Sequence, residues 1–71
     1  MWNARFKSII FNVKIKNRNH KNHRTIRYEF INATYKDAIE RLMRELNGNG
    51  EWKVTSCYID GMRFYIYLRG R

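Results

Sequence analysis

Residues 50–70 read GEWKVTSCYIDGMRFYIYLRG, which is two β-rich runs on either side of Asp60 and Gly61. An Asp-Gly pair between two such runs is the strongest short-range signal of a β-hairpin. A two-residue turn sets the register of the arms, so Ile59 should face Met62, with the pairing continuing along both arms. Opposed residues share a face, and this stretch therefore predicts a hairpin with two distinct faces.

The two faces of this hairpin differ in composition. One face is mostly apolar, has a lysine at its open end, and consists of Lys53, Thr55, Cys57, Ile59, Met62, Phe64, Ile66 and Leu68. The other is aromatic and basic and consists of Trp52, Val54, Ser56, Tyr58, Arg63, Tyr65, Tyr67 and Arg69. The first predicts the core side. The second predicts a solvated surface that stacks bases or docks a partner, because rings offer flat area and arginines offer charge.

Two further strands are predicted before the hairpin. From Ile9 to Lys16 apolar and polar residues alternate, with Ile9, Phe11, Val13 and Ile15 on one face. In residues 24–31, RTIRYEFI, the alternation places Ile26, Tyr28 and Phe30 inward and leaves Thr25, Arg27, Glu29 and Ile31 outside. Residues 17–23, NRNHKNH, contain no apolar member and predict the loop between these two strands.

A helix is predicted from Tyr35 to Asn47. Thr34 is a suitable N-cap, and Asp37, three residues later, stands where a capping box has its acidic partner. Gly48 is a favourable residue just past the end of a helix. The apolar residues of this segment recur at helical spacing, in a set made up of Tyr35, Ala38, Ile39, Leu42, Met43 and Leu46.

The element order ββαββ predicts an α+β fold in a single small basic domain spanning residues 1–71. A chain of 71 residues has room for only one core. With one apolar side on the helix and one on each strand, the chain should bury its apolar surface between two layers. We therefore predict a four-stranded antiparallel sheet with one helix packed on one face. Strand orders 2-1-3-4 and 1-2-4-3 both allow full antiparallel pairing.

Net charge is the strongest global signal of function. The chain carries 15 Lys and Arg against 6 Asp and Glu, a formal charge of +9. Between residues 34 and 47 three basic and three acidic side chains cancel, so the excess lies outside the helix. A small protein can stay soluble with less charge and with either sign. The separation of a neutral layer from a basic one points instead to a polyanionic partner, most often nucleic acid.

Single-stranded RNA or DNA suits this predicted surface better than a duplex, whose grooves admit a helix or a narrow ribbon rather than a broad sheet. The expected phosphate contacts are Lys14, Lys16, Arg18, Lys21, Arg24, Arg27, Arg63 and Arg69. The expected stacking residues are Trp52, Tyr58, Tyr65 and Tyr67. The competing interpretation of the tyrosines is that they are ordinary strand formers.

A protein-interaction module is the alternative function. The same aromatic and arginine-rich face resembles the core of a protein interface in composition. It could form a homodimer, or block the anionic cleft of a nucleic-acid-processing enzyme in the manner of small phage-encoded inhibitors. The abundance of Asn, Ile, Lys and Tyr hints at a low-GC genome or a phage.

An enzyme is the third class considered. A small ribonuclease could use His20 or His23 as acid and base, but both lie in the polar loop and no carboxylate is placed to orient either. His20 and His23 also lack the further ligands that zinc requires. We find no phosphate-binding glycine loop, nucleophile motif or cofactor fingerprint. We therefore predict no catalytic residue, no metal site and no cofactor.

The cellular setting is predicted from the apolar runs and the cysteine content. The longest apolar run, residues 64–68, is too short for a transmembrane helix or a signal peptide, so we expect a cytoplasmic protein without a membrane partner. The single cysteine, Cys57, cannot form an internal disulfide and lies on the apolar hairpin face. It is predicted to be a small buried side chain rather than a reactive thiol.

Overall fold

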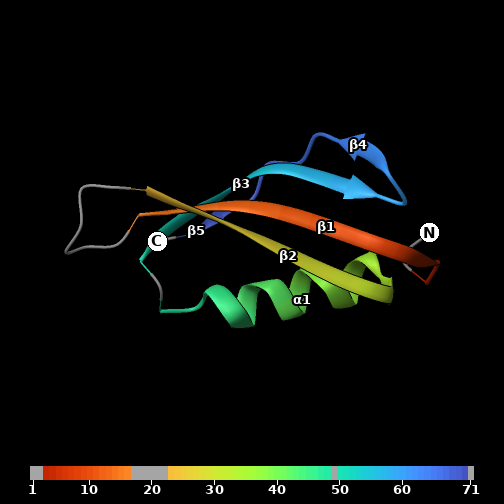
Figure 1. The fold of residues 1–71 in the computed structure, drawn as a ribbon. Coiled ribbons are helices and arrows are strands. Elements are labelled where there is room, and N and C mark those ends of the chain that lie inside the picture. Colours follow the sequence, from red (N-terminus) through yellow and green to blue (C-terminus); the bar gives the residue numbers. More distant parts are fainter. Residues whose placement is uncertain (1–2, 17–22, 49, 71) are drawn as a thin grey trace.

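A computed structural model describes residues 3–16, 23–48 and 50–70. The elements are β1 (Arg5–Lys16), β2 (His23–Thr34), α1 (Tyr35–Leu46), β3 (Glu51–Ile59), β4 (Met62–Phe64) and β5 (Arg69–Gly70). All strand pairs are antiparallel, in the order β2-β1-β3-β4, with β5 also paired to β3. The helix packs on one face of the sheet (Figure 1). The predicted α+β fold is confirmed, and the strand order is the first of the two alternatives.

The pairing of β1 with β2 follows the predicted alternation. Ile9, Phe11 and Val13 are opposite Phe30, Tyr28 and Ile26, and these six residues form one face of the pair. Ile9, Phe11 and Val13 are fully buried. The Phe11 and Phe30 rings meet edge to face, with centroids 6.0 Å apart. The apolar alternation of the two strands therefore builds the centre of the core.

Helix α1 starts and ends where its sequence signals predict. The Thr34 hydroxyl accepts a hydrogen bond from the Asp37 N–H at 3.1 Å, which satisfies one of the free amides of the first turn. Gly48, just past the C-cap, has a φ of +85°. The side chains buried under the sheet are Ala38, Leu42 and Leu46. Met43, predicted to lie within the apolar stripe, is 46% exposed at its margin.

The turn between β3 and β4 also forms as predicted. Asp60 and Gly61 have φ angles of +49° and +83°, and positive φ at both central residues is what a type I′ turn requires. The pairs Cys57–Phe64, Tyr58–Arg63 and Ile59–Met62 have the predicted register. The turn is also attached to β1, because the Asp60 N–H donates to the Ser8 carbonyl at 2.8 Å and the Ser8 N–H donates to Asp60 Oδ1 at 3.0 Å.

A β-bulge interrupts β3 in its middle, which the strict alternation assumed from the sequence did not include. Asn12 of β1 is opposite Ser56, whereas the next residue of β1, Val13, is opposite Val54. Thr55 is therefore an extra residue on β3. Its hydroxyl donates to the main-chain carbonyl of Asn12 at 3.0 Å, which holds the bulge against β1.

The bulge exchanges the two faces of β3 over residues 52–54, so the predicted faces are wrong there. Trp52 and Val54 lie in the core, with 7% and 8% of their surface exposed, and Lys53 lies on the open face. Burying a tryptophan removes roughly 150–250 Å² from water, a gain of about 25 cal/mol per Å². Strict alternation would have exposed that ring and turned the lysine inward. The bulge avoids both costs.

The predicted fourth strand is divided into β4 and β5. Lys53 pairs with Arg69 and Trp52 with Gly70, one step from the register that would place Val54 opposite Tyr67. The segment 65–68 between them is not a strand, although the Val54 N–H donates to the Leu68 carbonyl at 2.9 Å.

Side chains along β4 and the following segment are less buried than predicted. Phe64 is 42% exposed and Met62 is 67% exposed, although the register places both on the helix side. Ile66 and Leu68 are half-buried and pack against the core. The register assigns these side chains to a face, but the helix does not cover that face along its whole length.

Candidate nucleic-acid interface

The sheet face opposite α1 has two ends that differ in charge. A hydrogen bond from Asn12 Nδ2 to Ser56 Oγ, 2.8 Å long, crosses its middle between β1 and β3. On one side of this pair lie the last residues of β1, the first residues of β3 and β5. On the other side lie the turn at Asp60, β4 and the second half of β2, which begins level with this pair at Arg27. We call these two regions the basic end and the turn end.

The basic end contains a row of three cations on neighbouring strands. Lys14 of β1 is directly opposite Lys53 of β3, and Lys53 is directly opposite Arg69 of β5. Within the described part of the chain, no carboxylate forms an ion pair with any of the three. Like charges placed opposite each other weaken a sheet. The row therefore opposes folding, and an anionic ligand would relieve it.

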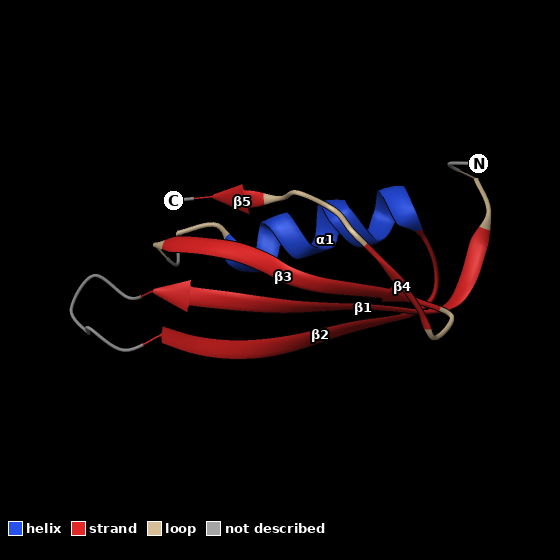
Figure 2. Cartoon of the chain, turned by 90° about the horizontal axis from the view of Figure 1, so that it is seen from above, coloured by secondary structure: helices blue, strands red, loops and turns tan. Residues whose placement is uncertain are grey.

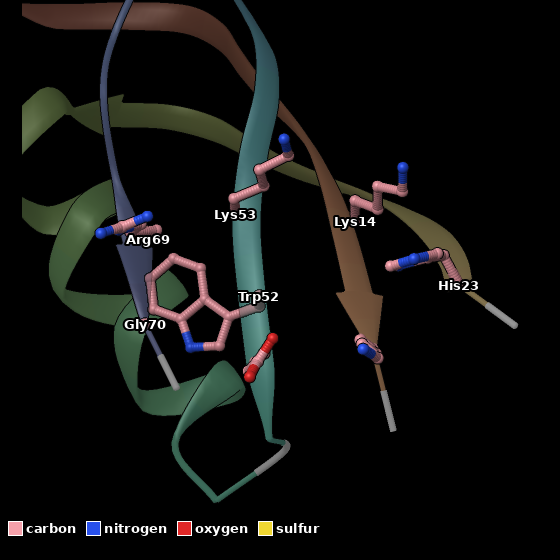
Figure 3. Close-up of a pocket in the computed structure, with 8 residues that line it drawn as sticks. Lys14, His23, Trp52, Lys53, Arg69 and Gly70 are labelled. Atoms are coloured by element: carbon pink, nitrogen blue, oxygen red, sulfur yellow. The ribbon is translucent and has the colours of Figure 1, made fainter. Parts of the chain in front are cut away.

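A groove of about 710 Å³ runs over this row. It is lined by Lys14, Lys16, His23, Glu51, Trp52, Lys53, Arg69 and Gly70. Four basic side chains and one carboxylate give it a formal charge of +3 with the histidine neutral. Figure 3 shows Lys14 and Lys53 on adjacent strands, and the Trp52 ring between β3 and β5. A Cβ at Gly70 would come within 2.5 Å of that ring, so the glycine allows β5 to approach β3 here.

Two exposed tyrosines follow the outer margin of the sheet. Tyr65 and Tyr67 are 86% and 82% exposed. The Arg63 guanidinium lies 5.1 Å from the centroid of the Tyr65 ring, and the Arg69 guanidinium 5.6 Å from that of Tyr67. Each arginine orients its ring by a cation–π contact. Arg69 thus joins the aromatic margin to the cation row. Tyr67 also lines a smaller groove of about 320 Å³ against α1.

At the turn end of the same face, the charged side chains of β2, the turn and β4 balance one another. Arg27 and Glu29 form an ion pair of 3.2 Å, and Glu29 also accepts a hydrogen bond from the Ser8 hydroxyl at 2.9 Å. Arg63 and Asp60 add one charge of each sign. Phosphate would have to compete with Glu29 for Arg27, so this end is a poorer anion site than the basic end.

The predicted contact residues separate into four groups. Those at the basic end or on the margin beside it are Lys14, Lys16, Tyr67 and Arg69. Those nearer the turn are Arg27, Tyr58, Arg63 and Tyr65, the last in contact with Arg63. Trp52 is the residue whose predicted place on the open face is wrong, and Arg24, predicted only as a phosphate contact, lies on the helix side. Those that lie outside the described residues are Arg18 and Lys21, as does His20.

The positions of Trp52 and Arg24 each have a physical cause. Trp52 is in the core because of the bulge at Thr55. Arg24 is opposite Ile15, so it shares the helix side of the sheet, beyond the buried part of β2. Lys53 is the residue that sequence reasoning missed, since it was assigned to the core face. The triplet Trp52-Lys53-Val54 was the available signal, because an apolar-polar-apolar alternation favours an outward lysine.

The two groups whose pKa is raised by burial, Cys57 and Tyr35, do not line the groove of the basic end. Cys57 is a free, buried cysteine, as predicted, and its burial raises the pKa of the thiol to about 11. Burial also raises the pKa of the Tyr35 phenol, and the neighbouring Cys57 adds to the shift. A thiol that stays protonated at neutral pH is a poor nucleophile. Among the described residues no three His, Cys, Asp or Glu side chains are grouped so that they could hold a metal ion.

Comparison with known proteins found no matching family model, no similar curated protein and no similar solved structure. Within the ranges that the structure describes, no helix is long and apolar enough to cross a membrane.

Proposed function

We propose that this protein binds single-stranded nucleic acid at the basic end of its open sheet face. Phosphates would contact Lys14, Lys53 and Arg69, with Lys16 at the rim of the groove. Bases would stack on Tyr67 and Tyr65. Each stacked base contributes roughly 1–3 kcal/mol and requires no particular sequence. Phosphate neutralisation by lysine and arginine releases counterions and makes binding depend strongly on salt.

The observation that supports this proposal most is the row of Lys14, Lys53 and Arg69 across three strands. Solubility needs dispersed charge, whereas this row concentrates cations where their repulsion weakens the sheet. The exposed tyrosines beside it add flat surface without adding to the core. A single-stranded nucleic acid on this face would bring its phosphates to the cation row and its bases to the tyrosines. A broad, open sheet surface favours a single strand over a duplex.

The test is fluorescence anisotropy of a labelled single-stranded oligonucleotide, of RNA and of DNA in parallel, titrated at about 50 and about 200 mM salt. We expect affinity to fall about tenfold or more between the two salts. The double variant Lys14→Gln, Lys53→Gln should bind more weakly. Its plot of log K against log salt should be less steep by about 1.4, because each phosphate contact on a single strand contributes about 0.7.

A matched control separates a localised site from net charge. The double variant Lys7→Gln, Arg44→Gln removes the same charge from exposed positions outside the groove. It should lose much less affinity than the groove variant. Equal losses in the two double variants would reduce the interaction to non-specific attraction, and no binding at low salt would reject the proposal.

A protein partner for the same face is the second candidate. It is favoured by the exposure of Tyr65 and Tyr67 and by their stacked arginines, since tyrosine and arginine are enriched in the energetically important centres of interfaces. An inhibitor of a nucleic-acid-processing enzyme would present this face to an anionic cleft. If nucleic acid does not bind, this candidate predicts that the protein inhibits a nucleic-acid-processing enzyme. Tyr65→Ala and Tyr67→Ala should then lose that inhibition.

A further inference from the structure

The outer edge of β2 is a long and regular strand edge. β2 is the last strand of the sheet on its side, and no described segment pairs with its outer edge. In Figure 2, α1 lies behind β3 and the segment before β5, while β2 runs along the opposite margin. The pairing with β1 keeps one register from His23 to Ile31. The first irregularity is Asn32, with a φ of +53°.

The two edges of the sheet are not alike. The other edge is broken between β4 and β5, where residues 65–68 are not a strand. Natural proteins protect exposed edges with proline, bulges or inward-pointing charges. Over residues 25–31, β2 has no proline and no bulge, and its charged side chains point to the open face. Alternate residues of such an edge direct their free N–H and C=O groups outward.

We propose that two copies of this chain pair antiparallel through β2, with the two-fold axis at Tyr28. Directly opposed residues in an antiparallel pair lie on the same face of the sheet. The faces are therefore preserved only in registers that place odd residues opposite odd residues and even residues opposite even residues. With the axis at Tyr28, Arg27 of each copy is opposite Glu29 of the other. The two existing ion pairs would then close into a ring of four alternating charges.

Neighbouring registers lack this complementarity. An axis at Arg27 would place the two arginines opposite each other, and an axis at Glu29 would do the same for the two glutamates. Like charges directly opposite are destabilising. An axis at Ile26 would leave Arg27 opposite Thr25. Only the axis at Tyr28 both pairs opposite charges and keeps the regular part of the strand in use.

The remaining pairs of this register are also compatible. On the helix side, the half-buried Tyr28 would face its own copy, and Ile26 would face Phe30. On the open face, Thr25 would face Ile31, a residue that is 65% exposed in the single chain. Aromatic and β-branched pairs of this kind stabilise antiparallel strands. The result would be one continuous sheet with both helices on the same side.

Analytical ultracentrifugation of the full chain, from about 10 μM to about 1 mM, tests for the dimer. We expect a dimer whose dissociation constant rises about tenfold or more in Arg27→Glu and in Glu29→Arg. These two changes move the net charge in opposite directions, so net charge cannot explain a loss in both. The combined variant Arg27→Glu, Glu29→Arg should restore the dimer, because it only exchanges the two signs. A chain that stays monomeric throughout this range would overturn the proposal.

Cysteine cross-linking tests the position of the axis. In a Cys57→Ser background, Tyr28→Cys should form an intermolecular disulfide on mild oxidation. Opposed Cα atoms in a sheet lie about 4.5–5.5 Å apart, within disulfide range. Ile26→Cys is the matched control, since its own copy would lie four residues away along the strand. Thermal melts confirm that both variants are folded. Equal cross-linking at the two positions would contradict this register.

Discussion

The two halves of β3 show how differently local and tertiary forces act on one strand. From Cys57 to Ile59 the strand has the register that the turn at Asp60-Gly61 dictates. From Glu51 to Val54 it has a register dictated by β1, displaced by the extra residue Thr55. The first half presents the predicted side chains on each face. The second half presents the opposite ones.

This difference shows that the influence of a tight turn is short-ranged. Asp60 and Gly61 control three residue pairs, and beyond those the burial of Trp52 and Val54 decides which way the chain faces. A single bulge costs little compared with an exposed indole. The same bulge places Lys53 beside Lys14 and Arg69. The candidate interface is therefore a consequence of core packing.

The largest expected effect on stability is that of removing the Trp52 side chain, which lies in the half of β3 from Glu51 to Val54. Trp52→Ala should lower the free energy of unfolding by about 3–5 kcal/mol, because it opens a cavity in a small core. Tyr58→Ala, on the open face of the other half, should cost about 1 kcal/mol or less. Chemical denaturation of both variants measures the two values. If Tyr58→Ala cost more than Trp52→Ala, the exchange of faces along β3 would be wrong.

The half of β3 next to the turn should be sensitive to backbone strain at the turn. Gly61→Val should destabilise the protein by at least about 1 kcal/mol, because a φ of +83° is strained for any residue with a Cβ and most for a β-branched one. Gly61→Asn is the control, since asparagine tolerates this conformation better. Thermal melts of the pair check the prediction, and a neutral Gly61→Val would contradict the type I′ turn.

The two halves of β3 meet at the bulge, where the Thr55 hydroxyl donates a hydrogen bond to the Asn12 carbonyl. Thr55→Val keeps the shape of the side chain but removes the bond to the Asn12 carbonyl, and should cost about 1 kcal/mol. Thr25→Val, at an exposed position on β2, is the matched control and should be close to neutral. Equal effects at the two threonines would mean that this bond does not hold the bulge.

The smallest expected effect on stability is at the row of Lys14, Lys53 and Arg69. It is a gain in stability, whereas the other three changes cause a loss. Lys53→Gln should leave the free energy of unfolding unchanged or raise it by up to about 1 kcal/mol at low salt, because it removes a charge that faces Lys14 and Arg69. The gain should shrink as salt screens the row. Denaturation at two salt concentrations measures it, and a clear loss of stability would mean that Lys53 has a structural partner.

The sequence by itself determined β1, β2, α1 and the turn between β3 and β4, but not the division of the last strand into β4 and β5. Alternation specified the faces of β1 and β2, Thr34 and Gly48 marked the ends of α1, and Asp60-Gly61 marked the turn. These are local signals, each carried by residues that are close along the chain. The exposure of Tyr65 and Tyr67 was predicted from the hairpin register, although residues 65–68 are not a strand.

Only the tertiary structure decided which strands are neighbours and where the basic side chains converge. β1 lies between β2 and β3, and this places Lys14 next to Lys53 although 38 residues separate them in the sequence. The bulge at Thr55 lets Trp52 and Val54 lie in the core opposite Ile15 and Val13 of β1. Such a fit depends on distant residues, so no local pattern specifies it. For the same reason Trp52 lies in the core and Lys53 lies on the surface.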